Sequence, residues 1–220
     1  MAEMKPKLLS DFDGTAVGIV GKTDPRNWLK YPLRGVKGYG EFLEGVRATG
    51  VEISGVVSRR PNIYLRRLAT HRSIEKLGYS EYFPGSEQVF LTGSETAKGR
   101  FVAEKSQEDT IGMIEDKPHK FGAALLSALV QGPDYFAVPH QPILMGVVWH
   151  PRSQENIEEL YRTINSNRYN DLKVTQTGPE TAVGMRVESE DFSLDVVQLY
   201  PFSKYEGRRF GEKLTDLASQ

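Results

Sequence analysis

Short apolar runs alternate with helix-like patterns along most of this chain, and this alternation constrains the fold more than any other feature of the sequence. Apolar runs that suit buried strands cover residues 7–12, 51–57, 88–91 and 110–114. Between them, apolar side chains recur at the three- and four-residue spacing of a helix, as in residues 39–46 and 121–128. Strands that alternate with helices form βαβ units around a mainly parallel sheet. We therefore predict an α/β fold, a Rossmann-like three-layer sandwich.

Three local patterns add detail to this prediction. Residues 61–76 are expected to form a helix, whose apolar side chains on one side are Tyr64, Leu65, Leu68 and Ala69. Thr92 and Glu95 have the spacing of a capping box, which predicts that a helix starts there. Residues 15–34 are rich in glycine, proline and charge, so we expect them to form a loop.

The last third of the chain is harder to assign to a sheet. Residues 182–187 and 192–199 have strand composition on either side of an acidic turn, which indicates a hairpin, and residues 203–217 suit a final amphipathic helix. We divide the chain into a core, residues 1–132, and residues 133–220, which hold the end of the core sheet plus a C-terminal α+β extension. The sequence leaves open whether this extension completes the first sheet or forms a small subdomain.

Composition limits the kinds of protein and partner. The chain has no cysteine, which excludes disulfide frameworks, thiolate metal sites and cysteine nucleophiles. Its 28 Lys and Arg residues balance 29 Asp and Glu residues, so the net charge of −1 gives no strong nucleic-acid signal. No apolar stretch approaches the ~18 residues of a membrane span, and residues 1–10 lack signal-peptide character. We expect a cytoplasmic protein without a membrane partner.

Two acidic residues close the first apolar run. In parallel sheets, ligands bind beyond the carboxyl ends of the strands, so the polar residues that follow each run are candidate site residues. A surface turn accounts for Asp13, which precedes a glycine. It accounts poorly for Asp11, because a carboxylate at the end of a buried strand is costly without compensation. A bound metal ion is the usual compensation.

Residues 11–15, Asp-Phe-Asp-Gly-Thr after an apolar strand, resemble the first motif of the haloacid dehalogenase (HAD) superfamily of phosphatases and phosphotransferases. Residues similar to the three other motifs follow in the same order. Ser58 closes the next apolar strand, Lys98 lies in the first turns of a helix, and the acidic pair at 115 and 116 closes a later strand. The resemblance covers about residues 7–129.

Two of these assignments have competitors in the sequence. Ser54 is an alternative to Ser58, but it lies within its strand. Lys105 is an alternative to Lys98, but it leaves little room for the rest of a helix and a strand before Asp116. We prefer Ser58 and Lys98.

The resemblance implies a Mg²⁺-dependent phosphomonoester hydrolase. Asp11 would be the nucleophile that forms an aspartyl-phosphate, and Asp13 the general acid and then the general base. The implied Mg²⁺ ligands are the Asp11 carboxylate, the Asp13 backbone carbonyl and Asp116, with Glu115 assisting through water or replacing Asp116. The implied phosphate-binding residues are Ser58, Lys98 and Thr15.

Spacing between the motifs bears on the size of the substrate. HAD enzymes that act on small metabolites usually carry a cap domain, inserted between the first and second motifs or between the second and third. Neither interval has room for a full cap here. The site is therefore expected to be open to a phosphorylated macromolecule or lipid, unless the C-terminal region or a second subunit covers it and the substrate is a small molecule. Residues 15–34, with Trp28 and Tyr31, could form a small flap.

Other interpretations remain. A phosphotransferase of the same fold would use the same residues, and a non-catalytic HAD-like binding or scaffold module is the alternative from another class; a receiver domain fits the motif order poorly.

The charged residues beside the motifs are more simply interpreted as solvated than as substrate contacts: Arg59, Arg60, His119 and Lys120. His140 and His150 make a weak zinc pair. A homo-oligomer is possible.

Overall fold

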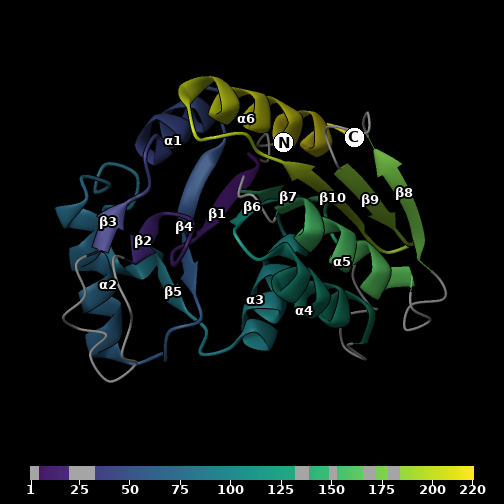
Figure 1. Cartoon of the computed structure of the whole chain (residues 1–220), viewed down its shortest axis with the longest axis horizontal. Helices are drawn as coiled ribbons and strands as arrows, with labels where there is room; N and C mark the ends of the chain where they lie inside the picture. Colours follow the sequence, from purple (N-terminus) through teal and green to yellow (C-terminus); the bar gives the residue numbers. More distant parts are fainter. Residues whose placement is uncertain (1–4, 20–32, 132–138, 149–152, 166–171, 178–183) are drawn as a thin grey trace.

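An eight-stranded sheet forms the centre of the structure, a computed structural model that describes residues 5–19, 33–131, 139–148, 153–165, 172–177 and 184–220. In order across the sheet, the strands are β5 (Val89–Leu91), β4 (Glu52–Ser58), β1 (Lys7–Asp11), β6 (Ile111–Glu115), β7 (Ile143–Val147), β10 (Ser193–Gln198), β9 (Gly184–Glu188) and β8 (Lys173–Thr177). Neighbours from β5 to β10 are parallel, whereas β9 and β8 add an antiparallel edge. The predicted α/β fold with a mainly parallel sheet is confirmed (Figure 1).

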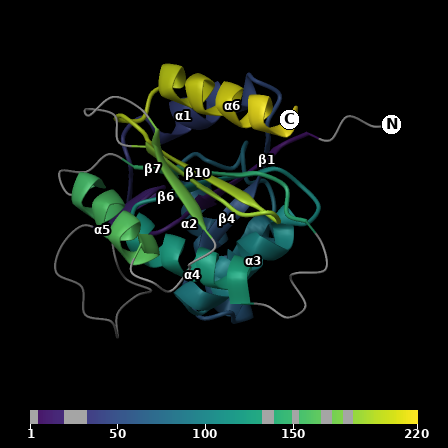
Figure 2. The ribbon, with the colours of Figure 1, turned by 90° about the vertical axis from the view of Figure 1, so that its right-hand side faces the viewer.

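Helices cover both faces of this sheet, as Figures 1 and 2 show. One layer holds α1 (Tyr39–Arg47) and α6 (Lys204–Ala218), and the other holds α3 (Glu95–Ser106), α4 (Pro118–Gln131) and α5 (Ser153–Asn165). Neighbouring residues of β1 serve the two layers, because Leu8 packs into the core cluster of α1 and α6 and Leu9 into that of α3, α4 and α5. A central strand buried on both faces accounts for its continuous apolar run.

The last third of the chain joins the sheet that the first part begins. β7 and β10 continue the parallel order, and β9 pairs with β10 as the predicted hairpin. The strand β8 is an addition that the sequence patterns did not indicate. α6 then returns to the first part of the chain and packs on α1.

Glycines allow α1 and α6 to approach closely. A methyl group at Gly45 of α1 would lie 2.1 Å from the carbonyl oxygen of Lys204. A methyl group at Gly207 of α6 would lie 2.0 Å from the carbonyl oxygen of Phe42. Real side chains do not tolerate such distances to backbone, so the two helices pack at a separation that only glycine permits.

The region that follows β1 differs from the predicted loop. β2 (Val17–Ile19) and β3 (Leu33–Gly35) pair as a two-stranded antiparallel sheet, so residues 15–34 are not all loop. The candidate flap residues Trp28 and Tyr31 lie outside the described residues.

Two helix starts also differ from the sequence prediction. α2 (Tyr64–Lys76) begins at residue 64, three residues later than expected, and is followed by a short 3₁₀ helix, η2 (Ser86–Gln88). The buried residues of α2 are Thr70 and Ile74, so this helix does not pack through the apolar side that the sequence predicts. α3 is capped by Ser94, whose side chain accepts a hydrogen bond from the Ala97 N–H, and not by Thr92. Ser94 immediately precedes the helix, which is the position where a short side-chain oxygen reaches the free N–H groups.

Among the described helices, none has both the length and the apolar character needed to span a membrane.

Candidate active site

Three strand ends meet at one edge of the sheet. β1 lies between β4 and β6 and is parallel to both, so Asp11, Ser58 and Glu115 come to the same carboxyl edge. β1 and β6 are in register, with Ser10 opposite Ile114, which places the residues that follow them side by side. This is the edge at which open α/β sheets bind their ligands.

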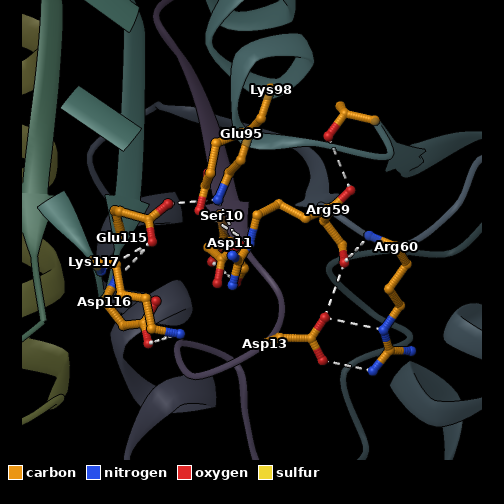
Figure 3. A network of polar contacts seen from close by, with 12 residues as sticks. Ser10, Asp11, Asp13, Arg59, Arg60, Glu95, Lys98, Glu115, Asp116 and Lys117 are labelled. Atoms are coloured by element: carbon orange, nitrogen blue, oxygen red, sulfur yellow. Dashed lines mark hydrogen bonds and ion pairs between the residues drawn. The ribbon is translucent and has the colours of Figure 1, made fainter. Parts of the chain in front are cut away.

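A buried lysine joins two of these carboxylates. The Nζ of Lys98 lies 2.5 Å from Oδ1 of Asp11 and 2.5 Å from Oε2 of Glu115 (Figure 3). All three residues are buried, with exposed fractions of 4% or less. Buried charges persist only when they are paired, and here one ammonium serves two carboxylates. When both are ionised, Asp11 and Glu115 therefore carry one negative charge more than Lys98 can balance.

Asp116 adds a third carboxylate to this group. One oxygen from each of Asp11, Glu115 and Asp116 lies within 4.8 Å of the others. Gly14 permits the approach of the loop after β1: its φ is +99°, and a methyl group there would lie 2.2 Å from Oδ2 of Asp116. Three carboxylates this close form a donor set that suits a hard divalent cation such as Mg²⁺.

The pKa values of these groups reflect their crowding. Burial, and then repulsion by Glu115, raises the pKa of Asp11 well above its usual value, although Lys98 opposes this. Burial and Glu115 together raise the pKa of Asp116 to about 7. Burial alone would lower the pKa of Lys98, but the two carboxylates more than offset it and raise it. A divalent cation bound between the three carboxylates would relieve this repulsion, because its charge would offset theirs.

Glu115 is the carboxylate that remains ionised most easily. Burial opposes its charge, but Lys98 and hydrogen bonds lower its pKa below the usual value. Its Oε1 accepts hydrogen bonds from the backbone N–H groups of Asp116, at 3.1 Å, and of Lys117, at 3.0 Å. These N–H groups precede α4, so the loop that carries Asp116 is fixed by Glu115 itself.

Asp13 lies on the other side of the site and points toward Arg60, away from Glu115 and Asp116 (Figure 3). Arg60 binds it with two parallel contacts, Nε to Oδ2 at 3.0 Å and Nη2 to Oδ1 at 2.6 Å. The Ser58 hydroxyl donates to Oδ2 at 2.9 Å and accepts from the Arg60 N–H at 3.2 Å. Asp13 and Ser58 are thus held together at the end of β4.

Arg60 itself is firmly placed, which corrects its interpretation as a solvated charge. Its side chain is 14% exposed, its Nη1 donates to Thr70 of α2 at 3.1 Å, and its guanidinium lies over the Phe12 ring at 4.8 Å. A guanidinium fork matches a carboxylate in two places, which a lysine cannot do. Arg60 therefore links α2 to the loop that carries Asp13.

The remaining predicted residues lie as follows. Thr15 is fully buried, and its hydroxyl has no hydrogen-bond partner among the described residues. The two competitors lie away from the site: Ser54 is inside β4 beside Glu52, and Lys105 is exposed near the end of α3. The structure therefore brings Ser58 and Lys98 to the edge where Asp11 lies. His150 is outside the described residues, and His140 contacts Ser106 at the far end of α3.

Two groups at the site have no functional role predicted from the sequence. Glu95, at the start of α3, pairs through Oε1 with Arg59 at 3.0 Å, and its buried Oε2 has no hydrogen-bond partner among the described residues. Burial raises its pKa. Tyr39 donates to the Ser10 hydroxyl at 2.7 Å, which in turn donates to the Asp11 carbonyl at 3.0 Å. A tyrosine in an apolar helix stripe gives no sequence signal for such a contact.

No protein-family model matches this chain, and no curated protein matches it at a significant level. The case for a function therefore rests on the residues and their geometry.

Proposed function

We propose that this chain is a Mg²⁺-dependent phosphomonoester hydrolase of the HAD type. The single observation that carries the proposal is the bridge from Lys98 to Asp11 and Glu115 at 2.5 Å each, with Asp116 beside them. A buried lysine between a strand-end carboxylate and an acidic pair is costly for a protein that needs only a fold. It is useful where a dianionic phosphate enters, because the lysine can then turn to the phosphoryl oxygens.

The residues present fit a magnesium ion. Asp11, Asp116 and the Asp13 carbonyl would hold it, with Glu115 as a direct or water-mediated ligand. When bound, Mg²⁺ supplies the positive charge that lets a carboxylate nucleophile and a phosphate approach each other.

The chemistry of the chain's own residues runs in two steps. In the first, an oxygen of Asp11 bonds to phosphorus while the bond from phosphorus to the ester oxygen breaks, and Asp13, which must enter this step protonated and turned from Arg60, gives its proton to that oxygen. In the second, water attacks the phosphorus of the aspartyl-phosphate while the bond from phosphorus to the Asp11 oxygen breaks, Asp13 takes a proton from that water, and inorganic phosphate leaves. Ser58 and Lys98 stabilise the charge on the phosphoryl oxygens.

The test is phosphate release from p-nitrophenyl phosphate by the wild type and by Asp11→Asn, with and without Mg²⁺. We expect turnover that requires Mg²⁺ and falls about 10³-fold or more in the variant. Phosphate passed to an added alcohol, in place of free inorganic phosphate, would identify a phosphotransferase. No turnover, together with no Mg²⁺-dependent rise in the melting temperature of the wild type, would favour the non-catalytic binding module.

A further inference from the structure

The first turn of α2 presents apolar side chains to solvent beside the site. Ile63 is 54% exposed, Tyr64 72% and Leu65 73%. Of the large hydrophobic residues in the described chain, only Tyr200 and Tyr205 share such exposure. α2 meets the core through Thr70 and Ile74, so the fold does not need these three side chains. Exposed apolar residues in consecutive positions indicate a contact surface.

The same segment is strongly basic. Between residues 59 and 76, Glu75 is the only acid, while the chain as a whole has a net charge of −1. The cations in this segment are Arg59, Arg60, Arg66, Arg67, Arg72 and Lys76. Arg72 and Lys76 are exposed, at the end of α2 away from the three apolar residues. Arg59 and Arg60 are neutralised by Glu95 and Asp13, so the positive charge that attracts anions lies along α2, over about 18 Å at 1.5 Å per helical residue.

This surface is continuous with the site. Ser58 ends β4, and the next two residues turn in different directions: Arg60 to Asp13, and Arg59 to Glu95 beside Lys98 (Figure 3). The side chain of Arg59 is 39% exposed, so it borders both the site and the solvent. A substrate whose phosphate reached Asp11 would place its next groups over Arg59 and the first turn of α2.

We propose that the α2 surface, formed by Arg59, Ile63, Tyr64, Leu65, Arg72 and Lys76, binds a single-stranded polynucleotide whose terminal phosphate is the substrate. This inference rests on the proposed phosphatase function. Cations follow the phosphates of such a strand, and exposed aromatic and apolar side chains stack on its bases, without preference for sequence. The surface offers both kinds of contact, with apolar side chains in the first turn of α2 and exposed cations near its end.

The arrangement fits two other anionic partners less well. A helix that binds a membrane surface carries an apolar stripe along its length. On α2, exposed apolar residues lie in the first turn, and charged Arg72, Glu75 and Lys76 occupy the exposed positions beyond it. A phosphopeptide presents one phosphate to a cluster of cations, which the catalytic site already supplies. Cations spread along α2 serve a partner that has a phosphate at every unit.

Binding is measured with the full-length Asp11→Asn protein, which cannot consume the ligand. Its titration into a fluorescent twelve-nucleotide single-stranded DNA or RNA, with a phosphate at either end, is followed by anisotropy at several salt concentrations. Arg72→Gln with Lys76→Gln is expected to lower the slope of log affinity against log salt by about 1.4, at about 0.7 per phosphate contact. Tyr64→Ala is expected to weaken binding about five- to tenfold. The matched control is Arg208→Gln with Lys213→Gln on α6, which removes equal charge and is expected to leave the slope unchanged.

Turnover separates this inference from the proposed function. For the wild type, kcat/KM for the phosphorylated oligonucleotide is compared with that for p-nitrophenyl phosphate, and Tyr64→Ala is expected to lower this ratio at least fivefold. Turnover of p-nitrophenyl phosphate without oligonucleotide binding would overturn the inference and leave the function in place. Binding only to anionic lipid vesicles or to a phosphopeptide would also overturn it. Oligonucleotide binding without any phosphate release would instead overturn the function.

Discussion

The carboxyl edge of β1 and β6 and the contact between α1 and α6 are built on opposite principles. At the edge, Asp11, Glu115 and Lys98 are buried as charges that crowd one another. Between the helices, Gly45 and Gly207 let backbones touch, and the surrounding core is apolar. Buried charges reduce stability when their pairing is incomplete, whereas close apolar packing adds to it. The helix contact thus serves the fold, whereas the incomplete pairing at the edge is what the proposed Mg²⁺ and phosphate would complete.

The largest expected effect comes from removing the shared cation with Lys98→Met. This change leaves Asp11 and Glu115 buried beside each other without a counter-charge. We expect the free energy of unfolding, measured in urea without added metal, to fall by about 3–5 kcal/mol. Phosphatase activity should be lost as well.

The control for this change is the double variant Lys98→Met with Glu115→Gln, which removes charge of both signs. It is expected to recover part of the lost stability but none of the activity. Equal stability of Lys98→Met and wild type would show that Asp11 and Glu115 do not depend on Lys98 for charge compensation. The contrast drawn between the edge and the helix contact would then be wrong.

Closing the gap between the helices should cost less. In Gly45→Ala, the new methyl group meets the Lys204 carbonyl, so the helices must move apart. We expect a loss of about 1–3 kcal/mol in urea denaturation, with phosphatase activity per folded molecule unchanged.

Gly40 of the same helix provides the matched control. A methyl group there would meet the Tyr79 ring at 3.6 Å, an ordinary contact distance. Gly40→Ala should therefore add up to about 1 kcal/mol through helix propensity alone. If both alanine variants changed stability in the same direction, the close approach of α1 and α6 would not be the cause.

The two regions also differ in how far the sequence predicts them. Asp11, Ser58 and Glu115 each end an apolar run, and a parallel sheet must bring such ends to one edge, so the edge follows from local patterns. The contact of Gly45 with Lys204 joins residues far apart in the chain, and a lone glycine in a helix gives no sign of its partner. For the same reason, the sequence does not predict the contact between Tyr39 and Ser10.

Local sequence patterns gave wrong predictions for side chains that could be either exposed or packed against the rest of the chain. Tyr64 and Leu65 have helical spacing with other apolar residues, yet the core accepts Thr70 and Ile74 from the opposite side of α2. Arg60 lies in a charged segment typical of a solvated loop end, but its contacts with Asp13 and Phe12 give it a partly buried position that only the folded chain defines. Hydrophobic periodicity shows which residues are apolar, but it does not show which other part of the chain packs against them.

A smaller effect, measured on the rate, is expected from breaking the ion pair between Arg60 and Asp13. Arg60→Ala frees the Asp13 carboxylate to turn, and misplacing a catalytic group lowers kcat about ten- to hundredfold. Because the lost group is a guanidinium ion, low millimolar guanidinium should restore part of kcat in this variant.

Arg60→Lys should stay slow, since an ammonium cannot bind both carboxylate oxygens. The same guanidinium concentration should leave the wild type and Asp13→Asn unaffected. Full activity in Arg60→Ala would remove Arg60 from the set of groups that position Asp13.

The edge should also show a pH dependence that the helix contact lacks. Asp116 has a pKa of about 7 in the folded protein, against 3.8 for an ordinary aspartate, so between those values the folded state holds more protons than the unfolded state. Stability in EDTA should therefore fall as pH rises from about 4 through 7. His140 contributes with the opposite sign, since burial lowers its pKa, so the comparison is made against Asp116→Asn in the same buffers. The variant should lose the part of the decline in melting temperature between pH 5 and 8 that Asp116 contributes, while Asp11, whose pKa burial and Glu115 also raise, keeps its own part. Gly45→Ala should keep the whole decline. Mg²⁺ should raise the melting temperature of the wild type most at pH 8, where Asp116 is ionised.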